Sequence, residues 1–180
     1  MSQIKVDSIV PRGGLSGGAS GGIIQTVHAF STTKIETSSD ADIISATITP
    51  SSSSSKILFM YNGNVAQEST EGREWAFIAY RGSTQIRLGR DENSNSRATF
   101  QAFGTDNVAV GSNNNGSYTI TGILVDEPNT TSAVTYKLAI EQFYTSGTTA
   151  IVKIGESGWD GTGIEQVTNG YSLTLMEISG

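Results

Sequence analysis

Short apolar segments separated by polar turns fill most of the chain after residue 22, and this spacing constrains the fold more than any other feature. Val, Ile, Thr and aromatic residues dominate the segments, whereas Gly, Ser, Asn and Asp dominate the turns. No stretch keeps an apolar period of 3.6 residues for more than about two turns. The pattern predicts an all-β antiparallel sandwich or barrel. The expected strands are 23–30, 41–50, 56–65, 74–81, 84–90, 97–103, 117–125, 134–143, 149–155 and 171–178.

Two of these segments, KILFMY and EWAFIAY, carry apolar side chains on both faces. A strand in a two-layer sandwich normally packs one face on the core and exposes the other to water. We therefore expect a second subunit to cover the outer faces, and a loop folded over the sheet is the alternative. The residues predicted to form the subunit interface or the core are Leu58, Met60, Trp75, Phe77, Ile78 and Tyr80.

The glycine-rich stretch GGLSGGASGG, residues 13–22, matches the pattern G-x-S-x-G twice. A hydrolase nucleophile elbow requires a strand before the serine, a helix after it and a partner histidine. Here a strand follows, and the one histidine of the chain lies inside it. The spacing also departs from phosphate-binding loops and from the three-residue period of collagen. A flexible tether remains, with hinge glycines Gly13, Gly14, Gly17, Gly18, Gly21 and Gly22.

The first twelve residues contain a short extended segment, IKVDSIV, that is too small to fold alone. It is either a disordered terminus or an anchor that adds to the surface of another protein, for example as an extra strand. The second interpretation divides the chain into an anchor (1–12), a tether (13–22) and a β-sandwich domain (23–180). The apolar contacts of the anchor would be Ile4, Val6, Ile9 and Val10.

Charge and composition argue against several classes of function. The net charge of −6 disfavours a generic nucleic-acid binder. Five arginines between residues 73 and 97 lie among acidic residues, which predicts solvated ion pairs, with an anionic-ligand patch as the alternative. No apolar run is long enough to span a bilayer, and the N-terminus lacks the apolar core of a secretory signal. We therefore expect synthesis in a cytoplasm, without membrane insertion.

No residue pattern predicts catalysis or a cofactor. Zinc is disfavoured by one histidine and no cysteine, and DENSNS departs from a calcium loop at its sixth and twelfth positions. The acidic pairs Asp40 with Asp42 and Asp126 with Glu127 lack a neighbouring aromatic cleft or further carboxylate. Two loops, one rich in asparagine and one containing Trp159, are candidates for receptor contact. Trp159 would also suit packing within the protein, and the asparagines would also suit a simple turn. Their residues are Asn113, Asn114, Asn115, Trp159 and Asp160.

Several segments together resemble the tail-fibre-like and other appendage proteins of tailed bacteriophages, especially those of marine bacteria. These segments are SQIKVDSIVP, ISATITPSSSSSKILFMYNGNV, VDEPNTTSAVTYKLAIEQF and SLTLMEISG, together with the glycine-rich tether leading into IIQTV. Proteins of this kind are similar in plan to the trimeric jelly-roll heads of complement C1q and tumour necrosis factor. The resemblance implies a homotrimeric, antiparallel jelly-roll-like sandwich carried on a virion by its N-terminus.

Three hypotheses follow from this resemblance. The first is a short tail-fibre-like or tail-tip adhesin whose head binds a glycan or protein on the host surface. The second is a capsid decoration or head-fibre protein with a mainly structural role. The third, a glycan-degrading tailspike-type enzyme, requires a carboxylate pair lining a groove, and the sequence shows no such constellation. We expect a binding protein, not an enzyme.

Overall fold

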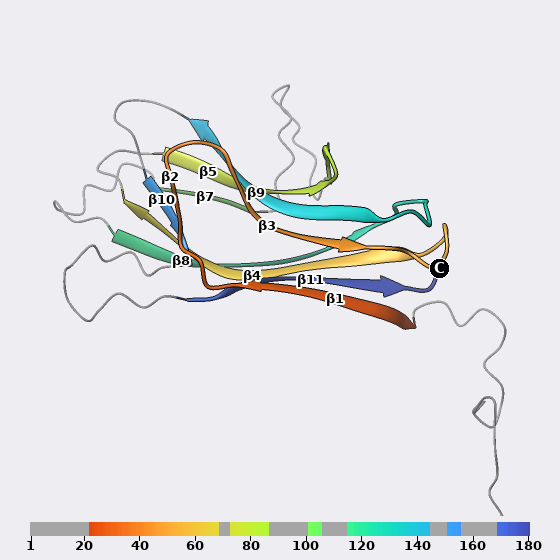
Figure 1. Ribbon diagram of the computed structural model, residues 1–180. Helices are drawn as coiled ribbons and strands as arrows, with labels where there is room; N and C mark the ends of the chain where they lie inside the picture. The colour runs from red at the N-terminus through yellow and green to blue at the C-terminus, as the bar shows by residue number, and fades with distance from the viewer. Residues whose placement is uncertain (1–21, 69–72, 87–100, 106–114, 145–150, 156–168) are drawn as a thin grey trace, which may run out of the picture.

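The computed structural model describes residues 22–68, 73–86, 101–105, 115–144, 151–155 and 169–180 (Figure 1). Within these ranges the chain forms strands and turns, and no helix long and apolar enough to cross a membrane is found. The strands are β1 (Ile23–Ser31), β2 (Ile35–Thr37), β3 (Ala41–Ile48), β4 (Lys56–Glu68), β5 (Arg73–Arg81), β6 (Thr84–Gln85), β7 (Gln101–Thr105), β8 (Asn115–Asp126), β9 (Val134–Tyr144), β10 (Ile151–Ile154) and β11 (Tyr171–Ile178).

The described strands confirm the all-β prediction and most of the predicted positions. β2 was not expected, because three residues carry too little periodicity to distinguish a strand from a turn. β3 ends at Ile48, before the predicted end at Pro50, because proline cannot donate a hydrogen bond to a neighbouring strand. Residues 87–90, 97–100 and 149–150 of the predicted strands lie outside the described residues.

The strands form two antiparallel sheets that face each other (Figure 1). Sheet A has six strands in the order β1-β11-β4-β10-β2, and β8 also pairs with β4. The first part of β4 pairs with β11 and the last part with β10, whereas β8 follows the opposite edge of β4 along its length. Sheet B has five strands in the order β3-β9-β5-β6, with β7 also paired to β5.

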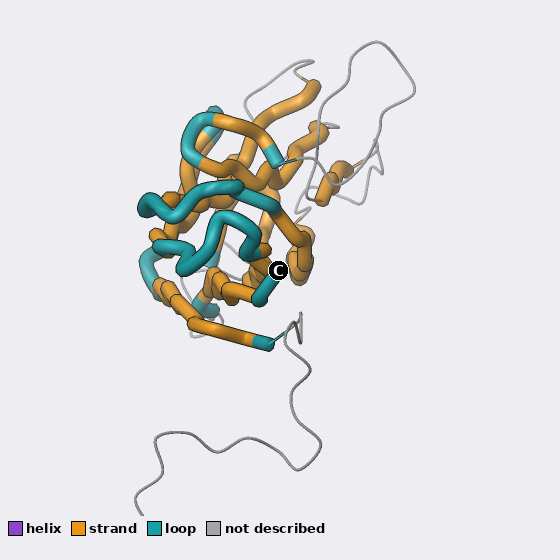
Figure 2. The backbone as a smooth tube through the Cα atoms, turned by 90° about the vertical axis from the view of Figure 1, so that its right-hand side faces the viewer, coloured by secondary structure: helices purple, strands orange, loops and turns teal. Residues whose placement is uncertain are grey.

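The connections between the sheets give the sandwich a jelly-roll-like topology. If the short strands β2, β6 and β10 are left aside, sheet A reads β1-β11-β4-β8 and sheet B reads β3-β9-β5-β7. The chain thus passes repeatedly from one sheet to the other, and its first and last strands are neighbours. Eight strands in two interleaved Greek keys define this arrangement. Loops gather at the end of the sandwich that holds the C-terminus (Figure 2).

The hydrophobic core lies between the sheets and is built from alternate residues of each strand. β11 shows this alternation along its whole length, with every second residue buried. Aromatic rings connect the two layers. The ring centroids of Phe59 and Tyr136 are 6.4 Å apart. Tyr61 stacks on Phe77, with ring centroids 6.1 Å apart. Such pairs contribute about 0.5–1.5 kcal/mol beyond the area that they bury.

A buried carboxylate, that of Glu177, organises the end of the sandwich near the C-terminus. Its Oε1 accepts hydrogen bonds from the Ser51 amide at 2.7 Å and from the hydroxyls of Ser51 and Ser55 at 2.6 Å each, and its Oε2 accepts one from Gln25 at 2.6 Å. Burial raises the pKa of Glu177, but these hydrogen bonds outweigh it and lower the pKa to about 2. The predicted turn at residues 51–55 is confirmed, and its serines solvate this carboxylate.

A second polar cluster joins the two sheets at Asp126. The Arg81 guanidinium lies 3.1 and 3.0 Å from the two carboxylate oxygens of Asp126, and the Tyr136 hydroxyl donates to the same carboxylate at 2.7 Å. Glu127, its neighbour, pairs with Lys56 at 2.9 Å. Arg81 therefore forms an ion pair, but with Asp126 of a distant strand in place of the acidic residues that lie near it in the sequence, and Asp126 is largely buried. The acidic pair serves to connect strands.

Candidate functional site

The outer side of sheet A carries an apolar patch. We call it the outer apolar face, and it consists of Leu58, Met60, Ile123, Val125 and Met176. Leu58 of β4 pairs with Met176 of β11 on one side and with Val125 of β8 on the other, while Met60 pairs with Ile123. Ile123 is 59% exposed and Val125 is 53% exposed. The alternation of β4 therefore places Leu58 and Met60 on the side opposite the buried Phe59.

Polar residues border much of the outer apolar face, but the edge strand β1 also exposes apolar side chains. Phe30, on the same side of β1 as His28, is 63% exposed, and Ile23 and Ile24 are exposed at the start of the strand. Toward one end of the strands, Lys56 forms its ion pair with Glu127. Toward the other end, Asn62 pairs with Ser172 and Thr121 on the adjacent strands. On β1, Thr26 neighbours Met176, and His28 Nδ1 lies 2.9 Å from Thr174 Oγ1. An apolar centre with a largely polar rim is the composition of a protein–protein interface.

The outer side of sheet B differs, because its apolar residues are already buried within one chain. Trp75 and Phe77 belong to the core between the sheets, and Ile78, which points the other way from β5, is 1% exposed. Ala76 and Ala139 on this outer side are also buried. Among the described residues, the outer side of sheet B therefore exposes no large apolar side chain.

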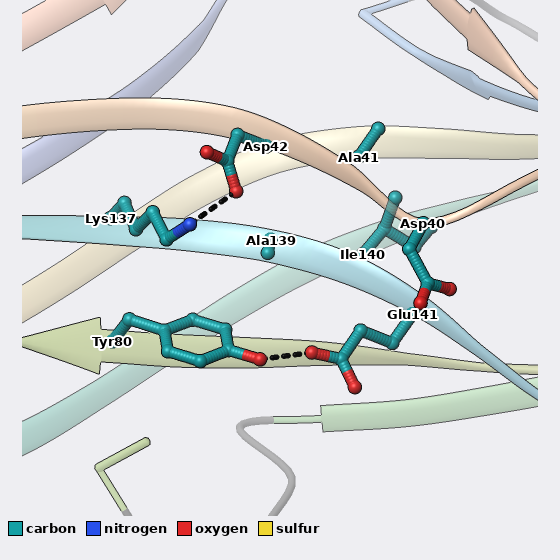
Figure 3. A pocket seen from close by; sticks show the side chains of 8 residues that line it. All are labelled: Asp40, Ala41, Asp42, Tyr80, Lys137, Ala139, Ile140 and Glu141. Atoms are coloured by element: carbon teal, nitrogen blue, oxygen red, sulfur yellow. Dashed lines mark hydrogen bonds and ion pairs between the residues drawn. The ribbon is translucent and has the colours of Figure 1, made fainter. Parts of the chain in front are cut away.

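A hollow of about 320 Å³ lies on this outer side of sheet B (Figure 3). Its floor is Ala139 of β9, which pairs with Asp42 of β3 on one side and Ile78 of β5 on the other. Lys137 and Glu141 lie two residues before and after Ala139 and therefore point the same way. A small residue between two long ones produces the depression.

The polar groups around the hollow are connected to one another. Lys137 Nζ lies 2.7 Å from Asp42 Oδ1 and 4.9 Å from the centroid of the Tyr80 ring. The Tyr80 hydroxyl donates a hydrogen bond to the Glu141 carboxylate and accepts one from Gln85 Nε2 at 3.1 Å. Burial and the hydrogen bond to Glu141 raise the pKa of Tyr80.

This hollow corrects the interpretation of Asp40 and Asp42 as an isolated acidic pair. The structure places an aromatic ring, Tyr80, and a third carboxylate, Glu141, on the same surface (Figure 3). Alternation along 134–143 could have placed Lys137 and Glu141 on one face. The pairing of β9 with both β3 and β5 could not be deduced from alternation, because pairing depends on the topology of the whole chain.

The other predicted site residues divide between described and undescribed parts of the chain. Gly22 is described, and its carbonyl accepts a hydrogen bond from the Ser179 amide at 2.9 Å. Asn115 is the first residue of β8 and pairs with Glu68. The remaining anchor, hinge and loop residues lie outside the described residues: Ile4, Val6, Ile9, Val10, Gly13, Gly14, Gly17, Gly18, Gly21, Asn113, Asn114, Trp159 and Asp160.

Within the described ranges, no group of three or more His, Cys, Asp or Glu side chains is arranged to hold a metal ion. The chain matches no protein-family model and no curated protein. Among the described residues, the outer apolar face of sheet A and the hollow on sheet B are surfaces whose composition suits binding.

Proposed function

We propose that the protein is a structural and binding component of a bacteriophage particle, with a β-sandwich head that assembles into a homotrimer through its outer apolar face. The single observation that carries the assembly is the exposure of Ile123 and Val125 beside Leu58, Met60 and Met176. The assignment to a virion rests on the resemblance of the quoted segments to phage appendage proteins.

Burial of this face supplies the driving force for assembly. Complete burial of a Val or Ile side chain contributes roughly 1.5–3 kcal/mol. Since Ile123 and Val125 are more than half exposed, covering them contributes roughly 1 kcal/mol each, repeated in every copy. The polar rim sets the limits of the interface, because its charged and hydroxyl groups are better solvated by water than they would be if buried between subunits.

The assembled heads would be held by the N-terminal segment, with 1–12 as anchor and 13–22 as tether. Three heads in one assembly present three copies of any weak ligand site, and avidity then compensates for modest affinity at each. In this arrangement the protein is a short host-binding appendage. Its partners are two further copies of itself, a virion protein bound by residues 1–12, and a molecule of the host surface.

Sedimentation velocity tests the assembly. The full chain is expected to sediment as a trimer, and Ile123→Glu as a folded monomer, because three carboxylates in an apolar interface repel each other and lose hydration. Thr131→Glu, which adds the same charge at an exposed loop residue, is expected to remain trimeric. A trimeric Ile123→Glu variant would show that another surface carries the interface.

Immunogold electron microscopy of intact particles tests the virion assignment. An antibody against residues 23–180 is expected to label the tail, and deletion of residues 1–12 is expected to abolish labelling while the head stays folded. Label over the capsid would instead identify a decoration or head-fibre protein. Particles without label, under conditions in which the denatured protein is detected, would contradict the virion assignment.

A further inference from the structure

The hollow on the outer side of sheet B has the size and chemistry of a binding site for a small polar molecule. Its volume of about 320 Å³ is near the lower end of the roughly 300–1,000 Å³ that small-molecule pockets occupy. A ligand of one ring fits this space. We propose that the hollow binds one uncharged sugar residue.

The lining offers both donors and acceptors, which a ring bearing several hydroxyl groups requires. Lys137 is a donor at one end of the hollow, where it contacts Asp42, and Glu141 is an acceptor at the other end, beside Asp40 (Figure 3). Each carboxylate accepts several hydrogen bonds, so Asp42 and Glu141 keep acceptor capacity beyond their contacts with Lys137 and Tyr80. Hydroxyl groups on opposite sides of one sugar ring can therefore each meet a polar group at their own end of the hollow.

The apolar part of the lining suits the C–H face of a sugar. Ala139 leaves the floor low and free of polar side-chain atoms, and Tyr80 forms one wall. Hydrogen bonds from Gln85 and to Glu141 hold the Tyr80 ring in place before any ligand arrives. A ring that is already ordered loses little conformational entropy when a ligand packs on it.

The charge of the lining defines which sugars are excluded. Among the described residues of the lining, Asp40, Asp42 and Glu141 are acidic and Lys137 is basic. An acidic sugar would bring a fourth carboxylate into this field and is selected against by repulsion. Uncharged sugars do not meet this penalty.

This inference deepens the proposed function, since it names the class of host-surface ligand, but its test is separate. Nuclear magnetic resonance titrations of the isotope-labelled full chain would use methyl glucoside, methyl galactoside and methyl mannoside, with glucosamine and glucuronic acid as charged probes. At least one uncharged glycoside is expected to shift the amide signals of Lys137–Glu141. Glucuronic acid is expected to bind at least about tenfold more weakly.

Two variants assign binding to the hollow. Ala139→Val fills the floor and is expected to abolish binding, whereas Ala133→Val, at an exposed alanine, leaves it unchanged. Should Ala139→Val fail to fold, Glu141→Gln provides the second test. It keeps the shape of the wall, removes one charge-assisted acceptor, and is expected to weaken binding about tenfold.

Four results would overturn the inference: no signal shift with any glycoside, preferential binding of glucosamine, equal binding of glucuronic acid, or binding that neither variant alters. Sedimentation of the same samples keeps the two proposals distinguishable. A trimer that binds no sugar disproves the ligand site alone, and a monomer that binds sugar disproves the assembly alone.

Discussion

The outer faces of the two sheets carry similar apolar patterns but differ in what covers them. On sheet B, Ile78 and Ala139 are almost completely buried within one chain, whereas on sheet A, Ile123 and Val125 remain more than half exposed. An apolar residue on both faces of a strand therefore indicates a second cover without saying whether that cover is the chain itself or a partner. The difference separates residues that stabilise the monomer from residues available for assembly.

The largest expected effect comes from placing the same charge on the two faces. Ile78→Asp buries an unpaired carboxylate and is expected to lower the free energy of unfolding by more than about 4 kcal/mol, which unfolds most domains of this size. Ile123→Asp is expected to leave the monomer folded and to abolish assembly. Circular dichroism during urea denaturation, combined with size-exclusion chromatography, measures both effects. Similar unfolding in the two variants would contradict the distinction between the faces.

The next effect concerns the β1 side of sheet A, where Glu177 joins β11 to β1. Glu177→Ala removes the acceptor for Ser51, Ser55 and Gln25 and is expected to cost about 2–4 kcal/mol of unfolding free energy. Glu127→Ala, which removes an exposed carboxylate, is expected to cost less than about 1 kcal/mol. Equal costs, measured by denaturant unfolding, would show that the buried cluster does not hold this end.

The same carboxylate predicts a dependence of stability on pH. The pKa of Glu177 is lowered from 4.5 to about 2 in the folded state. Its stabilising contribution is therefore fully present above about pH 4.5 and is lost as the pH falls toward 2. Thermal unfolding of wild type and Glu177→Gln between pH 2 and pH 6 measures this. The difference in stability between the two proteins is expected to shrink toward low pH, and a constant difference would contradict the assignment.

A smaller effect compares the two sides of β4. A Cβ atom at Gly63 would lie 2.4 Å from the Tyr61 hydroxyl and 2.7 Å from Tyr171 Cβ. Gly63→Ala is therefore expected to destabilise the monomer by about 1–3 kcal/mol through overpacking. Met60→Ala, on the outer side, is expected to weaken assembly more than it weakens the monomer. Denaturant unfolding at concentrations below and above the onset of assembly separates these outcomes.

The smallest effect is expected at the hollow on sheet B. Lys137→Met removes the exposed ion pair with Asp42 and is expected to change the free energy of unfolding by less than about 1 kcal/mol. Assembly is expected to stay intact, because Lys137 lies on the sheet opposite the outer apolar face. Loss of the trimer in this variant would place the interface on sheet B.

The positions of the strands followed from the sequence because period-2 alternation and turn residues are local signals. The two-faced pattern of 56–65 was equally readable, and Leu58 and Met60 do lie opposite Phe59. The sequence pattern did not identify which strands lie beside β4 and extend the outer apolar face. Ile123 and Val125 alternate with core residues, as in any strand, and their contact with Met60 and Leu58 depends on topology.

The polar clusters could not be derived from the sequence for the same reason. Glu177 lies far along the chain from the serines that bind it, and nothing near Glu177 indicates a buried carboxylate. Asp42 likewise meets Lys137, and Glu141 meets Tyr80, through strand pairing alone. Local patterns define strands, whereas sites require the order of the strands in the sheets.

The central claim, that copies of the chain meet through the outer apolar face, is most directly tested by electron paramagnetic resonance on the rim of that face. The chain contains no cysteine, so a nitroxide on Thr121→Cys reports from one position, with Thr131→Cys as a control. Spin–spin interaction between copies is expected for the label at residue 121, and this interaction is expected to disappear when Ile123→Glu is added. A mobile label at residue 121 with no interaction between copies, in a protein that is nevertheless trimeric, would contradict the claim.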